Sequence, residues 1–168
     1  MDPAYDPQRW ESFYVMTGGA AAALTGLLFV AMSLHSKAIT SHPVYGGRAV
    51  GTLVGLMAQL FLAGAVLVPG QTVTAIGVEV EVVALYFLVT TWRAILNMRK
   101  RGIAPAPGRL RSRIELIGAS IWMVLFVVSG VSLIAQTGGG FYLLAVVMLF
   151  MFGWNVYVAW VLITEIAD

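Results

Sequence analysis

Two carboxylates, Glu79 and Glu81, lie inside the apolar stretch GVEVEVVALYFLVTTW that covers residues 77–92. A carboxyl group inside a membrane segment can carry a proton or attract a cation, and such residues are candidate functional residues for that reason. On a helix, side chains two positions apart differ by about 200° in direction. Glu79 and Glu81 therefore cannot share one catalytic or metal-binding site, and at most one of them faces a given interior.

The depth of these carboxylates depends on which residues of their segment cross the membrane. If the helix crosses over 72–92, Glu81 lies within about 3 Å of the bilayer midplane, where a charge costs roughly 2.5 to 3.5 kcal/mol and needs an interior partner. If it crosses over 78–98, both glutamates lie at the outer headgroups, and Arg93 extends its guanidinium group to the inner surface. Three interpretations stay open: interfacial carboxylates, a buried structural pair, and a proton or ion pathway.

Other polar residues fall near the centres of the neighbouring apolar blocks, at a depth similar to that of Glu81: Thr25, Gln59, Ser129 and Asn155. An unpaired amide in hydrocarbon is unfavourable, so Gln59 and Asn155 are expected to find hydrogen-bond partners inside the protein or across a subunit interface. Glu81 is the natural candidate partner. The whole layer is interpreted either as packing contacts between helices or as the polar lining of a transport pathway.

The elements that must position these residues are membrane helices. The chain has 168 residues, of which 60% are hydrophobic and 11% charged, and this balance is that of a membrane protein. Four apolar blocks of spanning length, together with the block that holds the glutamates, predict an all-α bundle of five transmembrane helices that forms one embedded domain over 1–168. The expected spans are 12–34, 49–68, 72–98, 115–135 and 141–164, with a basic loop at 99–114.

The basic residues predict the orientation of the chain. Five spans place the termini on opposite sides, and nine of the ten Lys and Arg residues then share one face, with only Arg9 opposite. The positive-inside bias puts the N-terminus outside, and the C-terminus and the 99–114 loop in the cytoplasm, as expected for a multi-pass protein of the bacterial inner (plasma) membrane. The residues expected to contact anionic lipid headgroups are Arg99, Lys100, Arg101, Arg109, Arg111 and Arg113.

Small residues recur at helical spacing in the first two spans. Gly19, Ala23 and Gly26 lie along one strip of the first span, and Gly51 and Gly55 form a GxxxG pattern in the second. Such strips allow helix backbones to approach closely, and this contact is a main source of association in lipid. They predict contact either within the monomer or between copies, and the second alternative implies a homo-oligomer.

No arrangement of residues typical of an enzyme is present in the sequence. The chain has no cysteine and no nucleophile, P-loop or dinucleotide-binding motif. We therefore expect no catalytic residue, no cofactor, no bound metal and no nucleic-acid partner. The leading hypothesis is a non-enzymatic, self-associating pore or small-ion or proton pathway, and the alternative is an accessory or scaffold subunit of a larger membrane complex.

Four stretches resemble a widespread set of small multi-span proteins of the bacterial inner membrane: GGAAAALTGLLFVAMSL, GRAVGTLVGLMAQL, VPGQTVTAIGVEVE and NVYVAWVLITEI. The resemblance covers nearly the whole chain and implies a topology but no activity. Separately, ALTGLLFVAMSL resembles the pore-lining first helix of Orai calcium channels. The filter glutamate of that family would fall on Leu34, and the orientation expected for this chain is the reverse, so the activity is not carried over.

Overall fold

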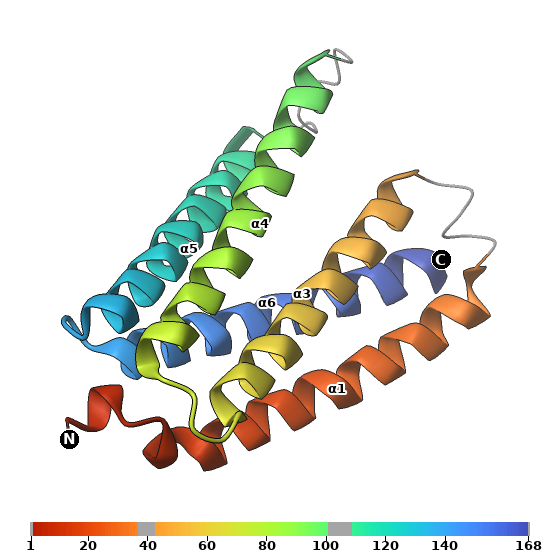
Figure 1. Ribbon diagram of the computed structural model, residues 1–168. Helices are drawn as coiled ribbons and strands as arrows, with labels where there is room; N and C mark the ends of the chain where they lie inside the picture. Colours follow the sequence, from red (N-terminus) through yellow and green to blue (C-terminus); the bar gives the residue numbers. More distant parts are fainter. Residues whose placement is uncertain (1, 37–42, 101–108, 168) are drawn as a thin grey trace. The chain divides into compact units, whose positions relative to one another are not determined.

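The computed structural model describes residues 2–36, 43–100 and 109–167; most of these residues are helical, and no strand occurs among them (Figure 1). Two short 3-10 helices, η1 (Pro3–Tyr5) and η2 (Pro7–Trp10), precede the α-helices. The α-helices are α1 (Glu11–Leu34), α3 (Pro43–Leu67), α4 (Val73–Lys100), α5 (Arg109–Ala135) and α6 (Gly140–Ala167). The all-α class predicted from the sequence is confirmed.

Four segments of the described chain are helical and long and apolar enough to cross a membrane: Pro7–Leu34, Ala49–Leu67, Val73–Arg93 and Gly140–Val161. In the part of α5 whose side chains are described, the apolar stretch is Ile121–Ala135. The lengths and composition of these helices indicate a membrane protein.

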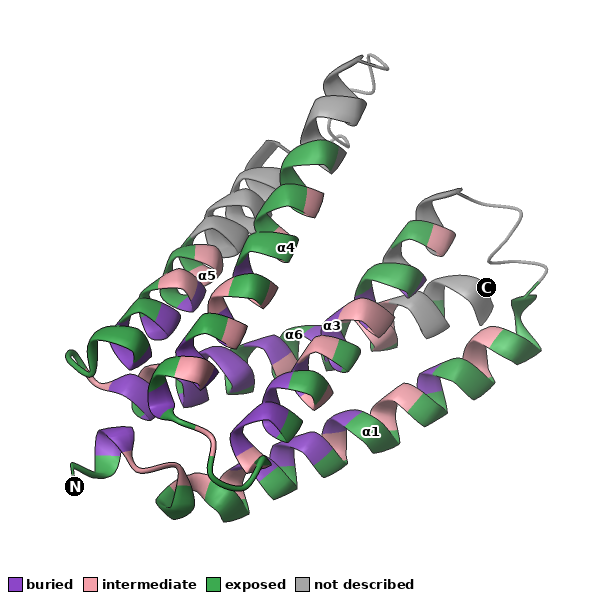
Figure 2. Ribbon diagram, viewed as in Figure 1, coloured by how far each residue is buried: buried purple, intermediate pink, exposed green. Residues whose placement is uncertain are grey.

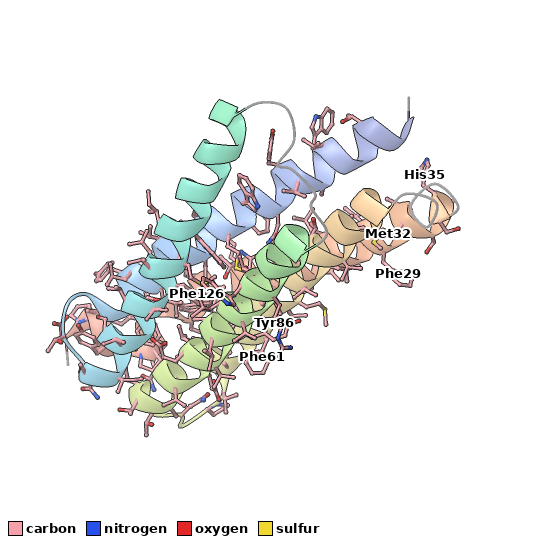
Figure 3. The ribbon with its side chains drawn as sticks, turned by 90° about the horizontal axis from the view of Figure 1, so that it is seen from above. Phe29, Met32, His35, Phe61, Tyr86 and Phe126 are labelled. Carbon is pink, nitrogen blue, oxygen red and sulfur yellow. The ribbon has the colours of Figure 1, made fainter. Side chains whose placement is uncertain are left out.

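Large apolar side chains cover the outward faces of the helices. Phe29, Phe61 and Tyr86, which are labelled in Figure 3, are each more than half exposed, and exposed residues follow much of α1 in Figure 2. In water such a surface would be an extended apolar patch, whereas lipid tails solvate it favourably. The exposed apolar faces are therefore consistent with helices that contact lipid tails.

The reversal between α3 and α4 forms at Pro69 and Gly70. Gly70 adopts a φ of 75°, a left-handed conformation that glycine adopts without steric cost. Thr72 then caps α4, because its hydroxyl oxygen accepts a hydrogen bond of 3.2 Å from the backbone N–H of Ala75.

Helix α5 ends in a left-handed turn. Gln136 has a φ of 51°, and the N–H of Thr137 donates to the carbonyl oxygen of Ser132 at 3.1 Å, which satisfies a carbonyl group of the last turn. The three glycines that follow, 138–140, also have positive φ. Their lack of a Cβ atom permits this tight connection to α6.

The basic segment 99–114, predicted to be a loop, is helical at both of its ends. Helix α4 continues to Lys100 and α5 begins at Arg109, so both helices extend into 99–114. Lys and Arg have high helix propensity, and this favours the extension.

The helices form two compact units. The α4–α5 unit comprises Met1–Tyr5 and Thr72–Val147, and the α1–α3 unit comprises Asp6–Gln71 and Met148–Asp168. Helix α6 therefore contributes its first two turns to the α4–α5 unit and the remainder to the α1–α3 unit. This division is finer than the single domain expected from the sequence.

The α1–α3 unit is held by a close approach of its two long helices. A Cβ atom at Gly18 would lie 2.9 Å from the Cβ atom of Ala63, so the contact depends on the glycine. Around this point α1 buries Tyr14, Ala21 and Leu28, spaced as one helical face.

The α4–α5 unit has a similar close approach. A Cβ atom at Gly77 would lie 2.9 Å from the backbone nitrogen of Ile134 in α5. Further along the same pair, the rings of Phe87 and Trp122 meet edge to face at 5.6 Å, and the buried Phe126, labelled in Figure 3, packs beside both.

Candidate functional site

The carboxyl group of Glu81 lies against the backbone of α5. A Cβ atom at Gly130 would lie 2.9 Å from both Cγ and Cδ of Glu81, so the glycine leaves room for this side chain in its observed position. The Oε1 atom of Glu81 is buried and makes no hydrogen bond within the described part of the chain. Glu81 thus faces its partner helix, and Gly130 is the residue that accommodates it.

The position of Glu81 along α4 is described relative to the apolar part of that helix. Among the described residues, the segment long and apolar enough to cross a membrane is Val73–Arg93, and its centre is Val83. Glu81 lies two residues from that centre, which corresponds to about 3 Å along the axis. Which residues of α4 cross the bilayer stays a prediction. Glu79 is half buried and points to a different side of α4, as expected for residues two positions apart.

Gln59 forms a hydrogen bond between helices in the α1–α3 unit. Its side chain is 1% exposed, and its Nε2 donates to the carbonyl oxygen of Met148 in α6 at 2.8 Å. The sequence predicted a partner for this amide inside the protein or across an interface. The observed partner is a backbone group of the same unit, whereas the glutamates belong to the other unit.

Asn155 occupies the space beside a glycine of α3. A Cβ atom at Gly55 would lie 2.6 Å from Oδ1 and 2.7 Å from Nδ2 of Asn155, and the asparagine side chain is 6% exposed. Gly55 was expected to bring helix backbones together, and it does lie at a contact. The group that fills its space is a polar side chain.

The two hydroxyl residues of the expected layer bond to their own helices. Thr25 donates to the carbonyl oxygen of Ala21 at 2.7 Å, and Ser129 donates to that of Phe126 at 2.7 Å. A hydroxyl group satisfied in this way needs no partner on another helix. Thr25 and Ser129 therefore have local roles in the described structure.

The remaining small residues of the expected contact strips face outward. Gly19, Gly26 and Gly51 have no neighbouring atom within 4 Å of an added Cβ, and Ala23 is exposed. The close approach within the α1–α3 unit uses Gly18 instead, one position away and so about 100° around the helix. Contact of this strip with another copy stays a prediction.

A second set of contacts, which the sequence did not suggest, joins the N-terminal segment to the α5–α6 turn. The hydroxyl oxygen of Tyr5 accepts a hydrogen bond of 2.9 Å from the N–H of Gly139. The hydroxyl of Ser132 accepts one of 2.8 Å from the N–H of Gly140 and also contacts the carbonyl oxygen of Thr137. The ring of Tyr5 and the carbonyl group of Ala4 fill the place that a Cβ of residue 140 would take. The glycine run was the available signal, because three consecutive glycines leave room for another segment.

The residues expected to contact anionic lipid lie outside the described side chains. Arg101 falls in the segment 101–108, and of Arg99, Lys100, Arg109, Arg111 and Arg113 only the helical backbone is described. Their lipid contact stays a prediction. Among the described residues, no three His, Asp or Glu side chains come together as metal ligands.

Comparison with known proteins finds no matching family model, no matching curated protein and no matching solved structure. The resemblance to small bacterial multi-span proteins therefore stays a prediction.

Proposed function

We propose that this protein crosses the bacterial inner membrane five times, with its N-terminus outside and its C-terminus in the cytoplasm. Four helical segments have the required length and apolar character. The contact between Tyr5 and Gly139 supports a further crossing by α5. If α1, α3 and α4 each cross once, the α5–α6 turn returns to the side of the N-terminus only when α5 crosses as well. The basic segment 99–114 then contacts anionic lipid headgroups in the cytoplasmic leaflet.

Within this topology, the proposed function is a proton or small-ion pathway in which Glu81 is the group that binds and releases the ion. The observation that carries the proposal is the buried Oε1 atom of Glu81, near the centre of an apolar segment and against Gly130. No Lys or Arg whose side chain is described forms an ion pair with Glu81.

A partly buried carboxylate without a cation partner in the described part of the chain is unfavourable in hydrocarbon, and this supports a role in function over one in stability. A structural ion pair would hold a fixed partner beside the carboxylate. A carboxyl group that loads and releases a proton has to avoid such a partner. Proton transfer is therefore favoured over a structural pair.

Proton flux in proteoliposomes tests this proposal. The purified protein is reconstituted with an entrapped pH-sensitive dye, and a potassium gradient with valinomycin drives proton entry. The wild type is expected to acidify the lumen, Glu81→Gln to abolish that flux, and Glu81→Asp to keep part of it. Glu11→Gln is the matched control, because it makes the same chemical change at an exposed position at the start of α1.

Two results would contradict the pathway. One is a wild-type rate equal to that of protein-free liposomes, and the other is an unchanged rate in Glu81→Gln. Size-exclusion profiles of every variant distinguish a loss of proton flux from misfolding of the protein.

The second candidate function is an accessory or scaffold subunit of a larger membrane complex. The observation that favours it is the outward strip of Gly19, Ala23 and Gly26 on α1, which offers a close-packing face to another membrane helix. Purification in mild detergent separates the two candidates. A stable homo-oligomer favours the pathway, and reproducible co-purification of a larger membrane protein favours the subunit.

A further inference from the structure

Two buried amides in the α1–α3 unit each leave one polar atom without a protein partner. Gln59 is 1% exposed and Asn155 is 6% exposed. The Oε1 of Gln59 and the Nδ2 of Asn155 are buried and make no hydrogen bond within the described part of the chain. One atom is an acceptor and the other is a donor, so their requirements are complementary.

The orientation of the Gln59 amide follows from its contact with α6. The carbonyl oxygen of Met148 can only accept a hydrogen bond, so the group that donates to it at 2.8 Å is the NH₂ of Gln59. The oxygen of the same amide is therefore the atom left for another donor.

Both amides belong to the same α3–α6 contact. Asn155 fills the space beside Gly55, and Gln59 lies one turn further along α3, about 6 Å along the axis and on the same face. Met148, which Gln59 contacts, precedes Asn155 in α6, so the two helices run antiparallel here. The residues that carry the open acceptor and the open donor thus both belong to the α3–α6 contact.

We propose that this contact is a binding site for one small neutral molecule that both donates and accepts hydrogen bonds, with water as the occupant. The water accepts from Nδ2 of Asn155 and donates to Oε1 of Gln59. Buried polar atoms without protein partners are the usual place for such molecules. Neither amide carries a charge, so the pair offers no counter-ion to a charged ligand. The site lies in the unit that does not contain Glu81, and it does not depend on proton conduction.

A double-mutant cycle with Gln59→Leu and Asn155→Leu tests the bridge. The two side chains make no direct hydrogen bond, so without a bridging molecule their effects on the unfolding equilibrium constant multiply. With the bridge, either substitution removes the same water. The unfolding equilibrium constant of the double variant is then smaller, by roughly threefold to tenfold, than the value obtained by multiplying the two single effects. Asn155→Leu combined with Thr25→Val is the matched control, because the hydroxyl of Thr25 bonds to its own helix. The effects of these two substitutions on the unfolding equilibrium constant are expected to multiply.

A second measurement uses the unaltered protein, so that a variant that fails to fold does not decide the question. In nanodiscs, ¹⁵N-labelled protein is expected to show a water cross-peak to the side-chain NH₂ of Asn155, with slow exchange into deuterated buffer. Absence of that cross-peak would overturn the proposal. In variants that fold, a multiplicative cycle would overturn it as well.

Discussion

The glycines at the helix contacts differ in what an added methyl group would meet, and this difference predicts a graded series of alanine variants. At Gly77 the nearest atoms include the backbone nitrogen of Ile134 at 2.9 Å and the backbone oxygen of Gly130 at 3.0 Å. Backbone atoms cannot move aside without separating α4 from α5. At Gly130 the obstacle is the side chain of Glu81, which can rotate. At Gly64 no atom lies within 4 Å.

The magnitudes follow from two opposing effects. Overpacking a close contact costs about 1 to 3 kcal/mol, and replacing glycine by alanine inside a helix gains about 1 kcal/mol. For Gly77→Ala the upper end of the cost applies, and a net loss of about 2 kcal/mol is expected. Gly130→Ala should lose about 0 to 1 kcal/mol, because rotation of Glu81 relieves the contact. Gly64→Ala should gain about 0.5 to 1 kcal/mol.

Reversible unfolding in mixed detergent micelles, followed by circular dichroism, measures the series. Adding Glu81→Ala to Gly130→Ala removes the atoms that the new methyl group meets, and the combined variant should recover the loss caused by Gly130→Ala. Equal stability of Gly77→Ala and Gly64→Ala would refute the close packing of α4 on α5.

Further predictions concern the contact between Tyr5 and the α5–α6 turn, and the membrane topology. Tyr5→Phe removes the acceptor of the Gly139 N–H, so hydrogen exchange at Gly139 should accelerate, and stability should fall by about 1 kcal/mol; unchanged exchange would show that the hydrogen bond does not form. Because the chain contains no cysteine, single cysteines report topology cleanly. A membrane-impermeant maleimide added to intact cells should label Asp2→Cys and Thr137→Cys but not Arg101→Cys, and labelling of the third would place the basic segment outside.

The positions of the helices could be read from the sequence. The apolar blocks predicted five helices, and residues that favour turns, Pro69–Gly70 and the glycines 138–140, occupy two of the connections between them. These features are local, so a single chain carries them. The ends of α4 and α5 were less predictable, because Lys and Arg suit both a helix and a loop.

The packed faces could not be read in the same way. A membrane helix is apolar on all sides, so its pattern does not distinguish the face that meets a helix from the face that meets lipid. Gly18 and Gly19 differ by one position, yet the first is at a contact and the second is open. The contact of Tyr5 with Gly139 joins residues 134 positions apart, and the glycine run marks room for another segment without indicating which segment fills it.

The polar residues were recognisable as a set, but their partners were not. Gln59 was expected to need a hydrogen bond, and it makes one with a backbone carbonyl group that has no signature in the sequence. Gly130 is likewise identified as the neighbour of Glu81 only by the packing of α4 on α5.

The depth of Glu81 in the bilayer is the central claim, and spin labels on the lipid-facing side of α4 measure it most directly. Val78, Val82, Leu85 and Val89 are all exposed, and each can be replaced by a single labelled cysteine in this cysteine-free chain. Collision rates with oxygen and with a water-soluble nickel chelate then give the depth of each label. With the centre at Val83, labels at 82 and 85 are expected to be deepest, with those at 78 and 89 about 8 to 9 Å from the midplane. A depth that increases steadily from 78 to 89 would place the carboxylate near the outer headgroups and contradict the account.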